Sequence, residues 1–513
     1  MIDERSDRAT TEAAMQESTE LEASAELTRS QEPESPNEPR DRFTEEEIQQ
    51  IEDAHGQFLI FSKDMTLKKV KERNLAILYQ NHRDVVYSSE EQTFYLYSGK
   101  SGLWEKQSKI EMEKNIRDFI DSFVQAMEEY QVIYEKDGHS LNISVMNELC
   151  LEAQKTQFFE EPERKCEYWI HCKNSVLEYD PESTSWVRKD FSPEYHSRFQ
   201  IPVSYDPGAQ CTRFLNELIE PAMGEDDRDL LQLYAGQCLL GRNLSQKFLM
   251  LTGTAGGGKS TLVNVIQQII GQQNCEDLRL AHTDKRFETS HYVGKSLLIG
   301  SDVSSNFLNS EGSRMLKSLT GKDRIVAELK GVNETFTLRG QYNVLITSNS
   351  VPRVKLDGDA GAWKRRMLWI RYCNEATQNP IQDFDEVLFA EEGSGILNWM
   401  LEGAKRLLQN NGKIPLSEAQ KQRVAELLSE SDPVENFVRQ HTIPDQKAGT
   451  TTEVMWEKFS IYQKEMGSPV SKKQFYGKLN DAMNSVHKLG RRNDLGGKRG
   501  YSVRYVSSPC ISR

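Results

Sequence analysis

The sequence predicts an α/β fold made of several folded parts, and three patterns along the chain indicate it. Between about residues 246 and 415, short apolar runs of strand length alternate with helical patterns, which favours buried strands covered by helices. Residues 43–205 combine helical periodicity with aromatic, β-prone runs, which indicates a mixed α+β module. Residues 433–513 show helical segments followed by strand-like runs around a basic loop. We therefore expect an α/β core between an N-terminal accessory module and a C-terminal winged helix.

The composition is typical of a soluble and mostly folded chain. Hydrophobic residues make up 37 % and aromatic residues 9 % of the 513 residues. No apolar run reaches the roughly 18 residues of a membrane span, and the N-terminus lacks the pattern of a signal peptide. The eight cysteines form no CxxC pair, and Cys166, His171 and Cys172 lack a second ligand pair, so neither zinc nor a disulfide framework is indicated. We expect a reducing, cytoplasmic compartment and no membrane partner.

Charge is distributed unevenly along the chain, whose formal net charge is −14. Residues 1–42 hold twelve acids and five arginines and few large apolar side chains, which predicts a disordered acidic tail. A docking or regulatory segment is the alternative for this tail. Residues 471–513 hold ten Lys and Arg residues against two aspartates, so the basic end is a candidate DNA contact.

The N-terminal module, residues 43–205, is expected to contain helices and two aromatic hairpin segments. Residues 45–61 show a helical pattern, and Ser108 with Glu111 forms a capping box that begins a second helix. The aromatic runs within 85–104 and 168–186 indicate short hairpins. Their rings are expected to form hairpin core rather than to stack on bases, and we find no carboxylate cluster of the kind a primase needs.

A glycine-rich stretch in the middle of the chain carries the most specific pattern. A helical lead-in, residues 206–245, precedes an apolar strand at 248–251. Then come Gly253, four further residues, and Gly258-Lys259-Ser260 at the start of an apolar helix, which is the P-loop pattern in its required context. Backbone N–H groups of such a loop curl around phosphate oxygens, the lysine reaches the β- and γ-phosphates, and the serine hydroxyl ligates Mg²⁺. The predicted ATP-binding residues are Gly253, Thr254, Ala255, Gly256, Gly257, Gly258, Lys259, Ser260 and Thr261.

Polar residues follow two further apolar strands downstream of this loop. Asp302 ends the run at 296–300, where a carboxylate can hold Mg²⁺ or polarise the attacking water. Asn349 ends the strand at 343–348, where a polar side chain can hold the water or sense the γ-phosphate. Between the two, residues 325–338 predict a hairpin with Lys330 at its turn. Arginines follow at 365 and 366, and an arginine from a neighbouring subunit can neutralise transition-state charge.

Together these motifs resemble the superfamily-three helicases, specifically the phage/plasmid primase-helicase and poxvirus-type group. The resemblance covers about residues 80–510 and depends on the order and spacing of the motifs. They are Gly253–Ser260, the strand that ends at Asp302, Leu316-Lys317 with Thr320-Gly321 and Asp323, the strand 345–349, and Trp363 with Arg365-Arg366.

The resemblance implies a hexameric ring on an AAA-plus-type core, residues 246–415, that hydrolyses ATP with Mg²⁺ and moves along single-stranded DNA. Lys259 and Ser260 would then serve phosphate and Mg²⁺, Asp302 would be the Walker B acid, and Asn349 the sensor. Arg366 would be the finger supplied in trans, with Arg365 as the alternative. The hairpin tip at Lys330 would contact DNA in the ring pore, the alternative being an ordinary surface turn.

Two departures from the group bear on the mechanism. Many relatives carry an acidic pair or a glutamate at the end of the Walker B strand, whereas Ser301-Asp302 offers one aspartate. Relatives also often have an N-terminal primase domain, and we expect no room for one beside the acidic tail and the accessory module.

The C-terminal part is expected to be a winged helix after a linker helix at 416–432. Helices are predicted at 433–440 and 454–467, and Ser471 caps a third. Strands are predicted at 486–489 and 501–506. Lys472, Lys473, Lys498 and Arg499 are the predicted DNA-backbone contacts, the alternative being a solvated basic face.

The sequence therefore predicts an ATP-dependent DNA helicase of a phage, prophage or plasmid replication system, in the cytoplasm of a bacterial or phage-infected cell. The acidic tail, residues 1–42, is then a candidate docking segment for other replication proteins. Two alternatives stay open. One is an ATP-controlled DNA-binding or assembly switch without unwinding. The other is a primase-helicase with an unrecognised primer-synthesis site in residues 43–205.

Overall fold

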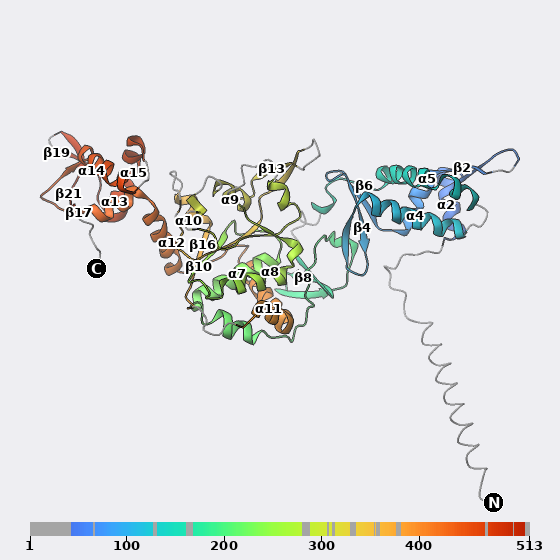
Figure 1. Ribbon diagram of the computed structural model, residues 1–513, viewed down its shortest axis with the longest axis horizontal. Helices are drawn as coiled ribbons and strands as arrows, with labels where there is room; N and C mark the ends of the chain where they lie inside the picture. The colour runs from blue at the N-terminus through green and yellow to red at the C-terminus, as the bar shows by residue number, and fades with distance from the viewer. Residues whose placement is uncertain are drawn as a thin grey trace, which may run out of the picture. The chain divides into compact units, whose positions relative to one another are not determined.

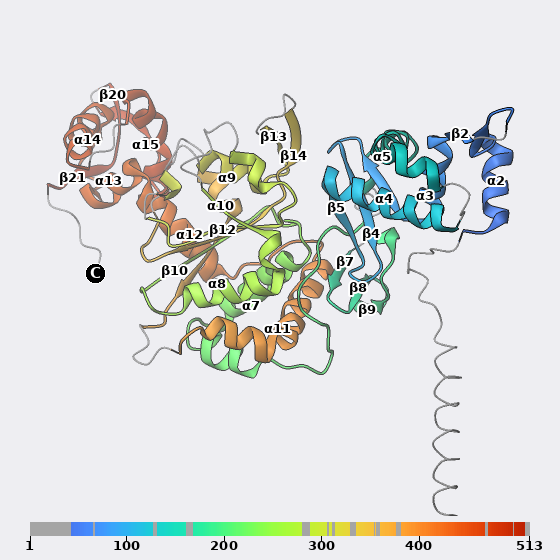
Figure 2. The same cartoon turned by 45° about the vertical axis from the view of Figure 1, so that its right-hand side comes forward.

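The computed structural model describes most of the chain in two compact units. One unit comprises residues up to Arg164 together with Phe191–Arg198, and the other comprises Lys165–Asp190 with Phe199 onward. The predicted acidic tail, residues 1–42, lies outside the described residues, and the finer domain boundaries at 206, 246, 416 and 433 stay predictions. The described residues are 43–64, 67–126, 131–160, 168–279, 288–304, 307–309, 313–328, 335–352, 354, 360–375, 381–466, 470–495 and 497–507 (Figures 1 and 2).

The first unit packs helices around a core rich in leucine and aromatic side chains. The helix predicted at 45–61 ends at His55, because Gly56 adopts a φ of +80° that suits glycine and ends helices. The capping box is confirmed, since Ser108 N–H donates to Glu111 Oε2 at 2.7 Å and Glu111 N–H donates to Ser108 Oγ at 3.2 Å. The elements are α2 (Glu45–His55), β1 (Leu59–Phe61), β2 (Leu67–Val70), α3 (Glu72–His82), α4 (Lys109–Ala126), α5 (Gln131–Glu152) and the 3-10 turns Phe158–Glu160 and Pro193–Tyr195.

Both aromatic segments form antiparallel three-stranded meanders, as the sequence predicts. In the first, Tyr95 and Trp104 are buried, which supports hairpin core as the role of these rings. The second meander belongs to the second unit. The strands are β3 (Val85–Ser88), β4 (Thr93–Ser98), β5 (Leu103–Gln107) and β6 (Gln154–Lys155) in the order β5-β4-β3-β6, and β7 (Trp169–Cys172), β8 (Ser175–Asp180) and β9 (Ser185–Lys189) in sequence order.

A five-stranded parallel sheet forms the centre of the second unit, which confirms the α/β prediction. Its order is β11-β12-β15-β10-β16, and every neighbouring pair is parallel. The central strands are apolar and buried on both faces, as parallel sheets covered by helices require. The strands are β10 (Phe248–Gly253), β11 (Cys275–Asp277), β12 (Leu297–Gly300), β15 (Asn343–Ser348) and β16 (Met367–Tyr372).

Helices cover both faces of this sheet. Figure 2 shows α7, α8 and α11 on one side and α9 and α10 on the other. Helices α7 and α11 touch backbone to backbone, since a Cβ on Gly236 would lie 2.1 Å from Ala404 N. The predicted helical lead-in, residues 206–245, contains a π-helix, Phe214–Ile219. The other helices are α7 (Glu225–Leu239), α8 (Lys259–Ile270), α9 (Ser313–Thr320), α10 (Ala360–Arg366), α11 (Phe384–Gln409) and α12 (Glu418–Ser431), with 3-10 turns Gln272–Asn274, Glu288–Tyr292 and Phe307–Asn309.

The hairpin predicted around residue 330 is present in its two strands. Strands β13 (Arg324–Glu328) and β14 (Thr335–Arg339) pair antiparallel, with Ile325 opposite Leu338. Lys330 lies outside the described residues, so its predicted place at the turn stays a prediction.

The C-terminal segment contains the three predicted helices, but one predicted strand is wrong. Residues 486–489 do not form a strand, because α15 continues to His487 and ends at Lys488 with φ +58°. Val486 packs on the local core from the last turn of α15, and Leu489 packs on it from the turn that follows. The elements are α13 (Pro433–His441), β17 (Thr442–Pro444), β18 (Thr450–Thr451), α14 (Thr452–Met466), α15 (Lys472–His487), β19 (Arg492–Leu495), β20 (Lys498–Tyr501) and β21 (Val503–Tyr505), with sheets β17-β21 and β18-β20-β19.

Within the described ranges, no helix combines the length and the apolar content needed to cross a bilayer.

Candidate functional site

The ends of three neighbouring strands bring the predicted site residues together. Strands β12, β15 and β10 are adjacent and parallel, with Gly300 opposite Ile346 and Thr252 opposite Ser348. The residues that follow these strands therefore lie at one edge of the sheet, the carboxyl edge. Open α/β sheets bind ligands at this edge, where the connections diverge.

The glycine-rich loop, residues 253–258, lies at the centre of the carboxyl edge and needs its glycines. Gly256 has φ +76°, and Gly258, the N-cap of α8, has φ +97°, a region that L side chains rarely adopt. A Cβ on Gly253 would lie 2.1 Å from Tyr372 O, and one on Gly257 would lie 2.7 Å from Asn374 O. The loop thus packs tightly on the chain after β16 and leads into a helix N-terminus, where backbone N–H groups favour anions.

Lys259 is buried over this loop with its ammonium group fully engaged by oxygen acceptors. Its Nζ donates to Gly253 O at 2.9 Å, Thr254 O at 2.8 Å and Asn349 Oδ1 at 2.9 Å. Burial lowers the pKa of Lys259, and the nearby Asp302 carboxylate opposes that change. The contacts hold the positive charge at the mouth of the loop.

Asn349 joins Lys259 to Asp302. Its Nδ2 donates to Asp302 Oδ1 while its Oδ1 accepts from Lys259. Asp302 has φ +44°, and its N–H donates to Thr347 Oγ1 at 2.8 Å, so a side chain of β15 fixes the turn after β12. Lys259, Asn349 and Asp302 therefore form one hydrogen-bonded series, which we call the polar triad. Thr347 is a contributor that the sequence analysis missed.

Oxygen ligands that suit Mg²⁺ are present at the same edge. Asp302 is exposed, and Ser260 is exposed at the first turn of α8, where Thr261 follows it. Among the described residues, no group of three or more His, Cys, Asp or Glu side chains forms a dedicated metal cage. A hydroxyl and one carboxylate fit Mg²⁺, which keeps waters and usually takes only about one or two carboxylates beside phosphate oxygens.

Arg365 and Arg366 lie at the opposite, amino edge of the sheet. They end α10 immediately before β16, whose first residue, Met367, pairs with Phe248, while Tyr372 pairs with Gly253. Five residue steps along a strand span roughly 17 Å. The structure therefore does not bring either arginine to the polar triad of the same chain.

The predicted DNA-contacting residues of the C-terminal segment lie on two elements. Lys472 and Lys473 are exposed in the first turn of α15, and Lys498 and Arg499 are exposed on β20. Lys498 Nζ lies 3.0 Å from Glu453 Oε2, and this hydrogen bond raises the pKa of Lys498.

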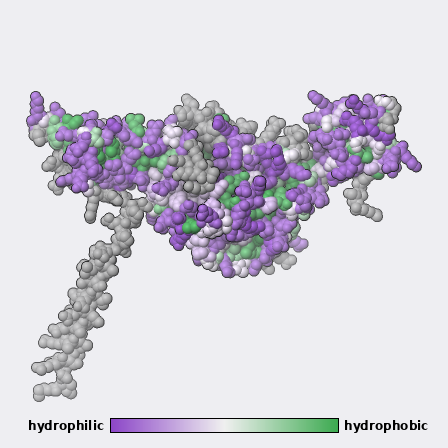
Figure 3. Space-filling model, turned by 180° about the vertical axis from the view of Figure 1, so that it is seen from behind, coloured by the Kyte–Doolittle hydropathy of each residue, from purple (hydrophilic) through white to green (hydrophobic). Residues whose placement is uncertain are grey.

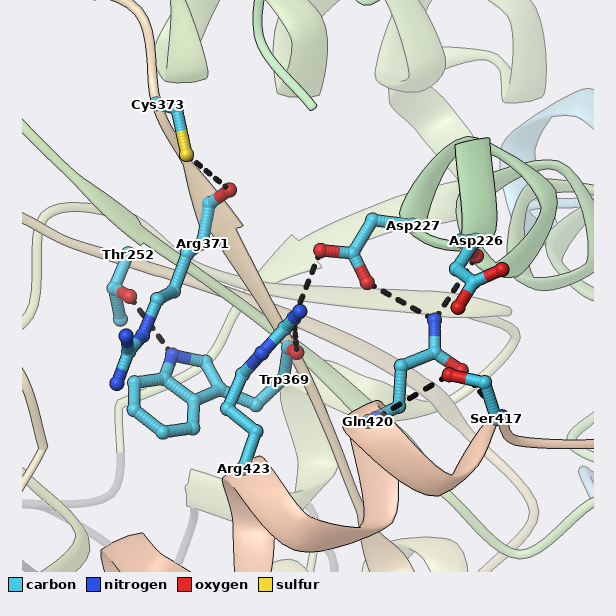
Figure 4. Close-up of polar contacts among 9 residues, drawn as sticks. All are labelled: Asp226, Asp227, Thr252, Trp369, Arg371, Cys373, Ser417, Gln420 and Arg423. Carbon is cyan, nitrogen blue, oxygen red and sulfur yellow. Dashed lines mark hydrogen bonds and ion pairs between the residues drawn. The ribbon is translucent and has the colours of Figure 1, made fainter. Parts of the chain in front are cut away.

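A partly buried ion pair next to β16 was not predicted from the sequence. Figure 4 shows Arg423 reaching from α12 toward Asp227, with Nη1 2.8 Å from Asp227 Oδ2 and 2.9 Å from Trp369 O. Gln420 Nε2 donates to Asp227 Oδ1 at 2.9 Å. Trp369 Nε1 donates to Thr252 Oγ1 at 2.8 Å, one residue before the loop. Only the capping pair Ser417 and Gln420 has a local sequence signal.

Comparisons with known families match two segments of the chain. Residues 74–220 match the family described as "D5 N terminal like". Residues 251–366, which include the glycine-rich loop and the polar triad, match a family of unknown function, DUF5906. The second segment contains every predicted catalytic residue, so a family without an assigned function covers the candidate site.

The known proteins that resemble the chain do so at low identity. A protein named "Putative helicase L207/L206", from Acanthamoeba polyphaga mimivirus, is 27 % identical over 144 residues, which is 27 % of this chain and 15 % of that protein. Similar solved structures include the A form of the apo NrS-1 C-terminal region, with 14 % identity, a TM-score of 0.44, and coverage of 86 % of this chain and 100 % of that one. Another apo structure of that region (residues 305–718) has 11 % identity, a TM-score of 0.35, and coverage of 68 % and 98 %.

Proposed function

We propose that the protein is an ATP-dependent DNA helicase of a phage, prophage or plasmid replication system, assembled as a ring that moves along single-stranded DNA. The observation that carries the proposal is the polar triad beside the glycine-rich loop, at three adjacent strand ends. The match to the family "D5 N terminal like" and the likeness to a viral protein named a helicase support replication as the setting.

The triad residues have distinct tasks under this proposal. Bound ATP with Mg²⁺ would supply the phosphoryl group and a metal that neutralises its charge. Lys259 would exchange its contacts with loop carbonyls for β- and γ-phosphate oxygens. Asn349, released from Lys259, would orient the attacking water or sense the γ-phosphate, and Asp302 would polarise that water. Ser260 would ligate the metal, with Thr261 beside it at the positive end of α8.

Assembly from several copies would supply the arginine that the site of a single chain lacks. Arg366 lies on the amino edge, too far from its own loop to reach a phosphate there. An arginine donated by a neighbouring chain would complete the charge stabilisation, with Arg365 as the alternative donor. This requirement supports the AAA-plus-type hexameric ring implied by the resemblance.

DNA contacts are assigned to two places in the proposal. Lys330, which lies between β13 and β14 in the sequence, would contact the DNA strand in the ring pore. Three helices together with the sheet β18-β20-β19 support the proposal that this segment is a winged helix with a DNA role. Lys472, Lys473, Lys498 and Arg499 would contact phosphates there.

The test is ATP hydrolysis with and without single-stranded DNA, together with displacement of one strand from a forked duplex. Lys259→Ala should abolish hydrolysis and unwinding, because it removes the phosphate-binding ammonium. Lys413→Ala, an exposed lysine on another surface, is the matched control and should behave as wild type. Full DNA-stimulated turnover in Lys259→Ala contradicts the proposal.

A second candidate function is an ATP-controlled DNA-binding switch that does not unwind. The observation that favours it is the single acid at the end of β12, because Ser301-Asp302 offers one carboxylate where relatives often have two. ATP-dependent DNA binding without strand displacement would select the switch. The primase alternative predicts template-directed incorporation of labelled nucleotides, and active ATPase without incorporation removes it.

A further inference from the structure

The hairpin of β1 and β2 in the first unit presents apolar side chains to solvent. Its base is anchored, since Phe58 and Leu59 are buried and Lys71 N–H donates to Phe58 O at 2.7 Å. Farther out, Ile60 is 43 % exposed and Phe61 is 40 % exposed. Figure 1 shows the hairpin, beside the label β2, extending past the helices of its unit. Isolated two-stranded hairpins are only marginally stable, so exposed apolar side chains on one call for an explanation.

Three lysines of the same hairpin are exposed. They are Lys63, Lys68 and Lys69, and Lys69 pairs across the hairpin with Ile60. The register shifts between Ile60 and Phe61, so the pairing skips Lys68. Such a bulge redirects side chains and is frequent at functional sites. Figure 3 shows hydrophobic surface bordered by hydrophilic surface at the end of the unit where the hairpin projects.

The hairpin is basic within an acidic unit. Residues 63–73 hold five Lys and Arg residues and two acids, whereas the rest of residues 43–164 holds nine bases and 22 acids. Lys69 lies 3.3 Å from Glu72 and Arg73 lies 2.7 Å from Glu152, so these two are partly neutralised. Lys63 and Lys68 therefore carry most of the outward positive charge of the hairpin, where Asp64 is the remaining acid.

We propose that the β1–β2 hairpin is a single-stranded DNA contact, separate from the C-terminal basic segment and independent of nucleotide hydrolysis. Phe61 would stack on a base, and Lys63 and Lys68 would contact flanking phosphates. Stacking of bases on exposed aromatic rings beside a positive backbone track is how proteins bind single strands without sequence preference. The inference rests on the proposed function only in taking DNA as the polymer.

Charge favours nucleic acid over a protein partner. A second copy of this chain would offer acidic side chains to Lys63 and Lys68, because acids outnumber bases in this unit. Its contact with Phe61 would have to be apolar, however, and would bring apolar side chains against the same two lysines. Single-stranded DNA matches both the apolar side chains and the lysines, because every base has an apolar face and every phosphodiester link carries a negative charge. Duplex DNA matches less well, since its bases are already stacked on each other.

The test measures binding of fluorescent poly-thymidine DNA to the full-length chain without nucleotide. Phe61→Ala should lower affinity roughly 5- to 150-fold, the range of one lost base stack. Lys63→Gln/Lys68→Gln touches no core residue and should reduce the slope of log affinity against log salt by about 1.4, as expected for two single-strand phosphates. DNA-free ATP hydrolysis should not change in either variant.

Matched control variants lie on α4 of the same unit. Ile110 is 79 % exposed and Lys109 and Lys114 are exposed, so Ile110→Ala and Lys109→Gln/Lys114→Gln alter the same chemistry elsewhere. Photo-crosslinking to iodinated poly-thymidine should label the peptide that contains Phe61 and not the one that contains Ile110.

Each outcome decides between the hairpin and the helicase proposals. If the hairpin variants bind DNA with the same affinity and the same salt slope as the control variants, the hairpin contact is wrong. This conclusion holds whether or not the chain hydrolyses ATP. A hairpin variant that changes sedimentation but not DNA binding also overturns it, and identifies a protein contact. Loss of binding and a Phe61 crosslink in a chain without ATPase activity support the hairpin contact and contradict the helicase.

Discussion

The two edges of the central parallel sheet differ in what they carry. At the carboxyl edge, three adjacent strand ends and a helix N-terminus hold Lys259, Asn349 and Asp302 in one hydrogen-bonded series. At the amino edge, Arg365 is exposed and Arg366 half-buried, immediately before β16. Because all strands run in the same direction, the two sets cannot meet within one chain. The difference teaches that the glycine-rich loop and the arginine pair are built into opposite edges of one sheet.

The largest effect should come from removing the arginine at the amino edge. Arg366→Ala should leave nucleotide affinity unchanged and lower kcat by about 10³–10⁵, the value of a finger donated in trans. Lys364→Ala, on the exposed side of the same helix, is the control. Mixing Arg366→Ala with Lys259→Ala chains should restore part of the turnover, because some interfaces then pair an intact loop with an intact arginine. Wild-type turnover in Arg366→Ala would contradict the assignment of Arg366 as an arginine donated to the neighbouring site.

A change that touches neither edge should alter stability rather than chemistry. Arg423→Ala should lower the free energy of unfolding by about 3–5 kcal/mol, because it leaves Asp227 as an unpaired buried charge. Lys421→Ala removes an exposed pair with Glu418 and should cost no more than about 1 kcal/mol. Urea unfolding of both variants measures the difference. An unfolding curve unchanged in Arg423→Ala means that the pair contributes nothing to the second unit.

The smallest effect should be on pH dependence, and it should belong to the carboxyl edge alone. Burial lowers the pKa of Lys259, so this ammonium loses its proton at a lower pH than a surface lysine. Triphosphate affinity should therefore fall as pH rises from neutral through that lowered pKa. ATP titrations at neutral and alkaline pH in wild type and Arg366→Ala should show the same decline, and a decline that needs Arg366 contradicts the assignment.

Much of the carboxyl edge could be predicted because its signals are local. Glycines at 256 and 258 are needed for positive φ, and continuous apolar runs before Gly253, Asp302 and Asn349 can hardly be anything but buried strands. No local pattern in the sequence, however, predicts the strand order of the sheet, which makes these three strands neighbours. The hydrogen bond from Asp302 N–H to Thr347 Oγ1 depends on it.

Other features could not be predicted because their causes lie far away in the sequence or are ambiguous. Asp227 and Arg423 are 196 residues apart, and their pairing depends on how α12 packs against α7 and β16. Val486 and Leu489 fit a strand or a helix end equally well over four residues. Tertiary packing selects the helix end, because Val486 packs on the core from α15 and Leu489 packs on it from the turn that follows.

The contact between Trp369 and Thr252 couples the fluorescence of the indole to the position of the glycine-rich loop. The indole is 2 % exposed, donates to the hydroxyl one residue before Gly253, and has the Arg371 guanidinium 4.8 Å from its ring centre. Fluorescence of an indole depends on its hydrogen bond and on nearby charge. Any ligand that shifts the loop should thus change the emission of Trp369 without an added dye, and Trp369→Phe should remove that change.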